Sequence, residues 1–123
     1  MFDHVEIKVV DLARSRSFYT ACLREIGYGM AFEKPDIAIG FGPDPHNMFV
    51  ICQAGPETLL TQHVHLAFKA KTVEAVKAFY RAALLHGGVE NGTPGPRPEY
   101  EPDYYAAFVL DPDGNNVEAV TVA

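Results

Sequence analysis

The sequence predicts an α+β fold built from two βαβββ modules. Two observations carry this prediction: an internal repeat of about half the chain, and the same order of strand and helix signals in each copy. The segment His4–Tyr19 recurs as His65–Tyr80, 61 positions later. A repeat of this length is a supersecondary unit used twice. We therefore expect one domain over residues 1–123, with module one at about 1–58 and module two at about 62–123.

The two copies match in residue type as well as in length. Asp11 and Thr72 stand at equivalent places, and both are residue types that cap helix N-termini. Identical pairs at the same offset are His4 and His65, Lys8 and Lys69, Phe18-Tyr19 and Phe79-Tyr80, and Gly27 and Gly88. Each module thus begins with a histidine near the start of its first strand.

Local patterns predict each element of module one. Residues 4–10 alternate between apolar and polar side chains, which is the period of a strand with one buried face. Asp11 caps a helix with one apolar stripe, and Gly27 ends it. Proline and glycine mark the turns that follow. The predicted elements are a strand at 4–10, a helix at about 12–26, and strands near 28–33, 36–41 and 48–52.

Module two repeats this order. Thr72 caps the helix, and Gly87-Gly88 ends it. The segment 93–103 is rich in proline and predicts a long loop, whereas Asp111-Pro112-Asp113-Gly114 predicts a tight turn. The predicted elements are a strand at 63–69, a helix at about 72–86, a strand near 89–92, and strands at 104–110 and 115–122.

Composition narrows the class of protein. The chain is 48% hydrophobic and 21% charged, which is ordinary for a globular domain. A net charge of −6 argues against a nucleic-acid partner. No apolar stretch is long enough for a membrane span, and the N-terminus does not read as a signal peptide. Cys22 and Cys52 form no close-spaced pair, which favours a reduced, cytoplasmic setting.

One face of each sheet is predicted to be polar. The helix of each module must cover the apolar face of its own sheet. The other face then carries His4, Glu6, Lys8, His63, His65 and Lys69. It is either solvated, as in many antiparallel sheets, or curved into a binding groove. The small residues Ala67 and Ala107 favour the groove, because they leave room there.

At this point the chain resembles the vicinal oxygen chelate superfamily, which includes glyoxalases, bleomycin-resistance proteins and extradiol dioxygenases. The resemblance rests on the two repeated segments and on the closing Asp-Pro-Asp-Gly-x-x-Val-Glu hairpin. It implies that the strands form a curled mixed sheet around a central groove, with the helices outside. It also implies a homodimer, sometimes with modules exchanged between chains.

The resemblance further implies a metal site. By motif match the ligands are His4, His65 and Glu118, and Glu118 is also the catalytic candidate. Two histidines and one carboxylate suit non-haem Fe(II), and they also accept Mn, Zn, Ni or Co. Glyoxalase-type relatives have a fourth ligand on the last strand of module one, where the matching position falls near Val50. Glu57 lies at the repeat offset from Glu118 but beyond that strand, so the four-ligand pattern is broken.

Other polar residues are weaker candidates. Long loops on a rigid scaffold often carry binding function, and an arginine beside tyrosines can clamp a carboxylate or stack on an aromatic ring. Arg97, Tyr100 and Tyr105 are therefore predicted to bind substrate; the alternative is a proline-stiffened loop with packed aromatics. Glu6 either takes part in acid–base chemistry or pairs across strands with Lys69.

Three functions are consistent with these observations. The first is a metal-dependent enzyme, either a lyase or isomerase of the glyoxalase kind or a ring-cleaving dioxygenase, acting on a small substrate that chelates the metal through adjacent oxygens. The second is a metal-free protein that sequesters a small molecule, as bleomycin-resistance proteins do. The third is a scaffold whose polar face is only a dimer interface. The ligand set favours the first.

Overall fold

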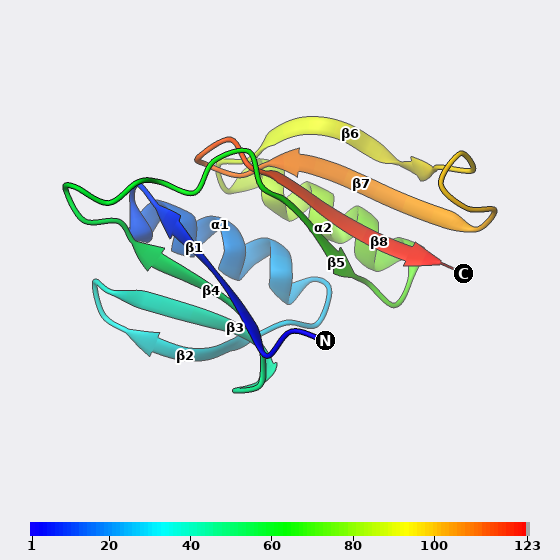
Figure 1. The fold of residues 1–123 in the computed structure, drawn as a ribbon. Coiled ribbons are helices and arrows are strands. Elements are labelled where there is room, and N and C mark those ends of the chain that lie inside the picture. The colour runs from blue at the N-terminus through cyan, green and yellow to red at the C-terminus, as the bar shows by residue number, and fades with distance from the viewer. Residues whose placement is uncertain (123) are drawn as a thin grey trace.

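The computed structural model describes residues 1–122, and its elements follow the predicted βαβββ order twice (Figure 1). Module one contains β1 (His4–Val9), α1 (Leu12–Arg24), β2 (Met30–Lys34), β3 (Ala38–Asp44) and β4 (Asn47–Gln53). Module two contains β5 (His65–Lys69), α2 (Val73–Leu85), β6 (Val89–Pro96), β7 (Tyr104–Leu110) and β8 (Asn116–Val122). The α+β class and the two-module organisation are thereby confirmed.

The strands form two separate four-stranded sheets rather than one curled sheet. Their orders are β1-β4-β3-β2 and β5-β8-β7-β6. In each sheet the first strand of the module pairs in parallel with the last, and the other pairings are antiparallel. The two modules therefore have the same topology. Within residues 1–122 no strand ladder joins them.

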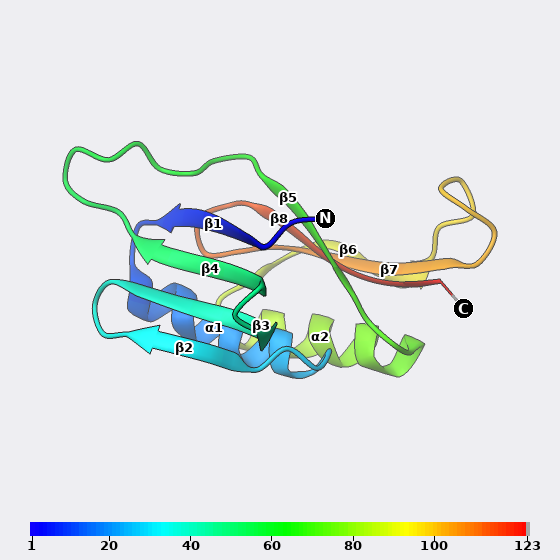
Figure 2. The same ribbon diagram turned by 60° about the horizontal axis from the view of Figure 1, so that its bottom comes forward.

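Helix packing holds the modules together. Helices α1 and α2 contact each other, α1 contacts β3 and β4, and α2 contacts β6, β7 and β8. Figures 1 and 2 show both helices side by side on one side of the two sheets, so the helices lie outside as predicted. One apolar core extends through both modules, and it includes Phe18, Ile51, Phe79 and Val117. The opposite face of each sheet, called the open face below, has no helix over it (Figure 2).

The helix ends have the same physical cause in both modules. Asp11 and Thr72 accept hydrogen bonds from the backbone N–H groups three residues later. After each helix a glycine takes a left-handed conformation, with φ of 92° at Gly27 and 96° at Gly87. The next N–H then bonds back to a carbonyl of the last turn, at Leu23 and Ala83 respectively. The same local signals thus end both helices, although Gly87 rather than Gly88, the repeat partner of Gly27, takes the left-handed conformation.

Several strand boundaries differ from the predictions, including both ends of β3, which spans Ala38–Asp44 instead of 36–41. Strand β6 continues to Pro96, into the segment predicted to be a loop. It is an edge strand with register shifts around Gly92 and Gly95, and an edge with bulges tolerates proline. Strand β5 begins at His65, because His63 has a φ of 57° in the bend before it. No helix in residues 1–122 has the length and apolar character needed to cross a membrane.

Candidate functional site

A buried carboxylate on the open face of module two forms the centre of the candidate site. Glu118 on β8 is only 2% exposed. Its Oε1 lies 2.8 Å from Nε2 of His65, and its Oε2 accepts a hydrogen bond from the Tyr104 hydroxyl. Burying a charged group is costly unless it has partners, and here both oxygens have one. The three side chains come from three neighbouring strands, β5, β7 and β8.

Strand pairing explains why these residues meet. Glu118 pairs with Ala67 on β5 and with Phe108 on β7. Ala67 is small, so the His65 ring can turn toward Glu118. The pKa of Tyr104 is raised to about 12, first by burial and then by its hydrogen bond to Glu118. Tyr104 therefore remains protonated, and a donor, over the whole physiological pH range.

An arginine and aromatic rings lie beside this carboxylate. The Arg97 guanidinium carbon is 5.5 Å from the centre of the Phe108 ring, which is itself 6.1 Å from the His65 ring. Tyr100 packs edge-on against Tyr104, with ring centres 5.2 Å apart. Arg97 also donates hydrogen bonds to the carbonyls of Thr93 and Pro96, which fix its position. Arg97 and Tyr100, both predicted substrate-binding residues, thus lie near the predicted ligands His65 and Glu118.

His4 lies on the open face of module one, where it lines a hollow that contains neither His65 nor Glu118. Its Nδ1 is 2.7 Å from Asp3, and the other oxygen of Asp3 is 2.8 Å from Nδ1 of His46. The Asp3 contact leaves the Nε2 atom of His4 free. The pKa of His46 is raised, chiefly by this hydrogen bond to Asp3. In the part of the chain that the structure describes, no three His, Cys, Asp or Glu side chains converge closely enough to hold a metal, so His4 does not join His65 and Glu118 within one chain.

The hollow around His4 contains a second carboxylate. Its volume is about 580 Å³, and its wall includes Glu6, Lys8, Val50 and Cys52. Glu6 pairs with Lys8, 3.0 Å away on the same strand, instead of with Lys69 as the cross-strand alternative had it. The pKa of Glu6 is lowered, first by its hydrogen bond to Lys8 and then by that to Cys52. The wall is completed by apolar side chains that include Phe32, Ile37 and Met48.

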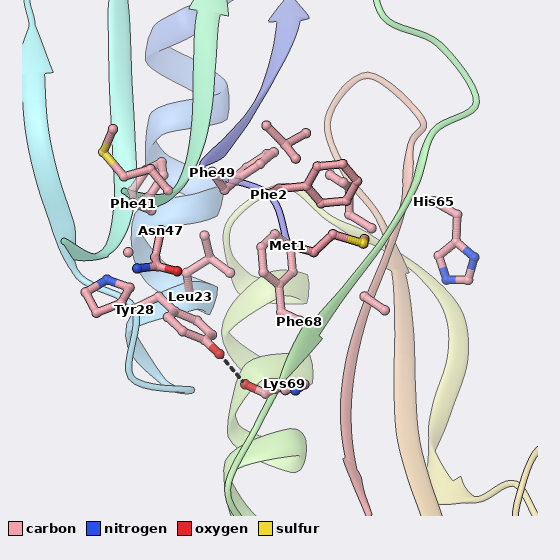
Figure 3. A pocket seen from close by; sticks show the side chains of 16 residues that line it. Met1, Phe2, Leu23, Tyr28, Phe41, Asn47, Phe49, His65, Phe68 and Lys69 are labelled. Atoms are coloured by element: carbon pink, nitrogen blue, oxygen red, sulfur yellow. Dashed lines mark hydrogen bonds between the residues drawn. The ribbon is translucent and has the colours of Figure 1, made fainter. Parts of the chain in front are cut away.

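A larger apolar hollow lies between the modules. Its volume is about 600 Å³, and it is lined chiefly by the N-terminus, β4 and β5. Figure 3 shows Phe49, Phe68, Leu23 and Tyr28 gathered around it, with His65 at its edge, where the ring points away from them across β5. The Tyr28 hydroxyl donates a hydrogen bond to the Lys69 carbonyl at 2.9 Å and so joins the two modules. His65 therefore lines one edge of this hollow and also contacts Glu118, which is not among the lining residues.

The side chains of β7 that lie on the open face are not the ones that the sequence predicted. Ala107, which was expected on the open face, and Tyr105, which was predicted to bind substrate, pack on the helix side against the core. Tyr104 and Ala106 face the other way, so Tyr104 rather than Tyr105 meets Glu118. A one-residue shift in a strand moves every side chain to the opposite face. The tight turn held the missing signal: pairing counted outward from it aligns Leu110 with Asn116 and therefore Phe108 with Glu118.

Strand register also identifies the position in module one that is equivalent to Glu118, where a fourth ligand would be expected. Val50 pairs with Glu6 two residues after His4, as Glu118 pairs with Ala67 two residues after His65. Val50 therefore occupies the place of Glu118 in module one, in agreement with the sequence-based expectation. Glu57 lies outside the strands and is exposed. It does not stand at the position equivalent to Glu118.

The donors present fit a divalent transition metal, but each module supplies only part of a site. His65 and Glu118 offer an imidazole nitrogen and a carboxylate oxygen side by side. His4 has one ring nitrogen held by Asp3, and metal-binding histidines are commonly oriented in this way. Imidazole together with carboxylate suits Fe, Mn, Zn, Ni or Co.

Comparison with known proteins places the chain in a family. The model of the Glyoxalase/Bleomycin resistance protein/Dioxygenase superfamily matches residues 1–119. A glyoxalase/bleomycin resistance protein from Albidiferax ferrireducens T118 has a similar structure, with 31% identity, a TM-score of 0.85, and 98% of each chain covered. A mutant glyoxalase I from Zea mays is 26% identical with a TM-score of 0.72, and the match covers 95% of this chain but 44% of that one.

A family enzyme from Burkholderia phytofirmans PsJN shares the fold, with 20% identity, a TM-score of 0.73, and 98% of each chain covered. None of the curated proteins compared with the chain matches it. The family model covers nearly the whole chain. The chain belongs to the glyoxalase/bleomycin resistance protein/dioxygenase superfamily.

Proposed function

We propose that the protein is a metal-dependent enzyme acting on a small substrate with two adjacent oxygens. The observation that carries this proposal is the His65–Glu118 pair, in which a buried carboxylate lies 2.8 Å from an imidazole nitrogen on an open sheet face. The metal is divalent, one of Fe, Mn, Zn, Ni or Co. Its ligands are His4, His65 and Glu118.

The chain's own residues prepare this site. When bound, the metal supplies Lewis acidity toward the substrate oxygens. Tyr104, whose pKa is raised to about 12, donates a hydrogen bond to one oxygen of Glu118 and leaves the other directed at His65. Glu118 is the candidate for moving a proton to or from the substrate, because it is the buried carboxylate at the centre of the cluster.

Arg97 and Tyr100 are proposed to bind the substrate. Arg97 lies over the Phe108 ring, so an anionic or aromatic group placed there meets both a guanidinium and a ring face. Tyr100 is 62% exposed and packs against Tyr104, which places it at the edge of the cluster. Tyr105 is left out of this role because it packs in the core.

We propose further that the site is shared between two copies in a homodimer. His4 of one chain would meet His65 and Glu118 of its partner when the open face of module one covers the open face of module two. A twofold dimer makes two such sites at once. Exposed apolar side chains on these surfaces, among them Phe2, Phe32 and Ile37, support burial against a second copy. Free Cys22 and Cys52 support a reduced, cytoplasmic setting.

Metal content tests the proposed ligands directly. Purified protein reconstituted with each of the five metals is expected to retain one of them at close to one ion per chain. His65→Ala is expected to lower the affinity for that metal by more than about 100-fold, because loss even of an outer-shell partner costs 10–100-fold. Elemental analysis after gel filtration, followed by titration against a competing chelator, measures both quantities.

His86→Ala is the matched control for this measurement. His86 ends helix α2, and its Nδ1 bonds to the carbonyl of Ala82, away from the open faces. Its replacement is expected to leave the metal content unchanged. Equal metal content in His65→Ala and the unmodified protein would remove His65 from the ligands. No retained metal after any reconstitution would contradict the proposed function.

Mixing two variants that each retain little metal tests whether the site is shared between two chains. His4→Ala and His65→Ala are each expected to retain little metal alone. A mixed dimer contains one complete site, made of His4 from the His65→Ala chain and His65 from the His4→Ala chain. Unfolding and refolding an equal mixture should therefore restore about a quarter of the metal content, since half the dimers are mixed and each has one intact site of two. No recovery would place all the ligands in one chain.

A second candidate function is metal-free binding of a small molecule. The observation in its favour is the apolar hollow of about 600 Å³ between the modules, a volume typical of small-molecule sites. Under this reading Phe49 and Phe68 supply the main contacts with the ligand, and no metal held by His65 and Glu118 is needed. Ligand binding that survives His65→Ala and Glu118→Gln, in a protein that retains no metal, would favour this function.

A further inference from the structure

The strand registers of the two modules place a carboxylate at the same level on both open faces. In module two, His65 is followed after two residues by Ala67, which pairs with Glu118 on the neighbouring strand. In module one, His4 is followed after two residues by Glu6, which pairs with Val50. The strands run in parallel in both cases, so the two residue pairs occupy equivalent positions. The acidic residue stands on the last strand in module two and on the first strand in module one.

Glu6 shares the open face with His4. Side chains alternate along a strand, and Ile7, on the other face, is buried in the core at 2% exposure. His4, Glu6 and Val50 line the same hollow of about 580 Å³. Paired residues on neighbouring strands lie about 5 Å apart, which is within the reach of a glutamate side chain. The Glu6 carboxylate can therefore occupy the space in front of Val50.

Glu6 is free to change partners at little cost. Its side chain is 44% exposed, and its ion pair with Lys8 joins two residues of one strand at the surface. Exposed ion pairs of this kind contribute little to stability. Glu118, by contrast, is buried between His65 and Tyr104. The fold therefore does not depend on Glu6 keeping its present contact.

We propose that Glu6 is the carboxylate ligand of module one, so that each module contributes one histidine and one carboxylate to the metal site. This inference rests on the proposed function above. The complete site would contain His4 and Glu6 from one chain and His65 and Glu118 from its partner. Two nitrogens and two carboxylate oxygens with open positions suit six-coordinate Fe, Mn, Ni or Co better than four-coordinate Zn.

Three variants, measured for metal affinity by competition with a chelator, test the inference. Glu6→Gln keeps the shape and removes the charge, and it is expected to lower metal affinity at least about 10-fold. Glu33→Gln is the matched control, because Glu33 also forms an exposed ion pair, with Arg16 at 2.7 Å, and is expected to bind metal like the unmodified protein. Glu6→Ala combined with Val50→Glu returns the carboxylate to the last strand and is expected to restore affinity lost in Glu6→Ala alone.

The outcomes separate this inference from the proposed function. Unchanged affinity in Glu6→Gln, with loss in His65→Ala, would overturn the role of Glu6 and leave the metal enzyme in place. Absence of metal from the unmodified protein after reconstitution would overturn both. Val50 is 5% exposed, so the double variant is checked by circular dichroism. If it does not fold, Glu6→Gln against Glu33→Gln decides the question alone, since both sites are at the surface.

Discussion

Asp111→Ala is expected to lower the free energy of unfolding by about 3–5 kcal/mol, a large part of the total stability of a domain of this size. Asp111 is 3% exposed and begins the turn between β7 and β8. Its carboxylate accepts hydrogen bonds from the Tyr19 hydroxyl, from the backbone N–H groups of Asp113 and Asn115, and from the Asn115 amide. Tyr19 and Asn115 are fully buried, and each donor left without a partner costs about 1–3 kcal/mol.

The contact with Tyr19 makes Asp111 important for the whole domain. Tyr19 belongs to α1 in module one, whereas Asp111 belongs to module two. The same turn also reaches the N-terminal end of α1 through Asp113, which accepts a hydrogen bond from the N–H of Val10. The pKa of Tyr19 is raised well above its usual value, first by burial and then by the Asp111 charge. Tyr19 therefore stays protonated, and a hydrogen-bond donor, at neutral pH.

Urea unfolding of three proteins checks this expectation. Tyr19→Phe removes one donor and leaves the carboxylate with its other partners, so a loss of about 1–2 kcal/mol is expected. Asp111→Ala should lower the midpoint much further with little change in the slope. A loss below about 1 kcal/mol in Asp111→Ala would show that the turn is not held by its carboxylate.

The sequence predicted this turn but not its role. Proline and glycine within Asp111–Gly114 identify a tight turn, because they restrict or free the backbone locally. That Asp111 is buried against Tyr19 depends on how α1 packs beside module two, and no local pattern encodes this packing. The repeat, in contrast, was sufficient for the element order, because Asp11, Thr72 and the two sets of glycines act within a few residues of themselves.

The sequence likewise identified residues of the candidate site but not all of the contacts between them. His65 and Glu118 were found from the repeat and the closing hairpin, and the structure brings them together because β5 and β8 are neighbours. Tyr105 rather than Tyr104 was chosen although the bounds of β7 were predicted correctly, because the pairing of β7 with β8 decides which residues share a face with Glu118. His4 lies on the other sheet, so the proposed site would need a second chain to bring it to His65 and Glu118.

Glu118→Gln is expected to have the opposite effect to Asp111→Ala: metal affinity falls by more than about 100-fold while the free energy of unfolding changes by less than about 1 kcal/mol. The glutamine keeps the shape of the side chain. Its oxygen can accept the hydrogen bond of Tyr104, and its amide can donate to the His65 ring in the other tautomer. The network is thus preserved, whereas the charge that a metal needs is removed.

Asp111→Asn is the matched control for this change, because it also replaces a buried carboxylate by its amide. Four donors surround Asp111, and the new amide group repels some of them, so stability should fall by about 1–3 kcal/mol. Metal affinity should be retained, because Asp111 lies at the turn, apart from the Glu118 cluster. If Glu118→Gln instead lost stability and retained metal, Glu118 would be a structural residue like Asp111. Two buried carboxylates in one module would then differ in position but not in function, and the metal site would have to be sought elsewhere.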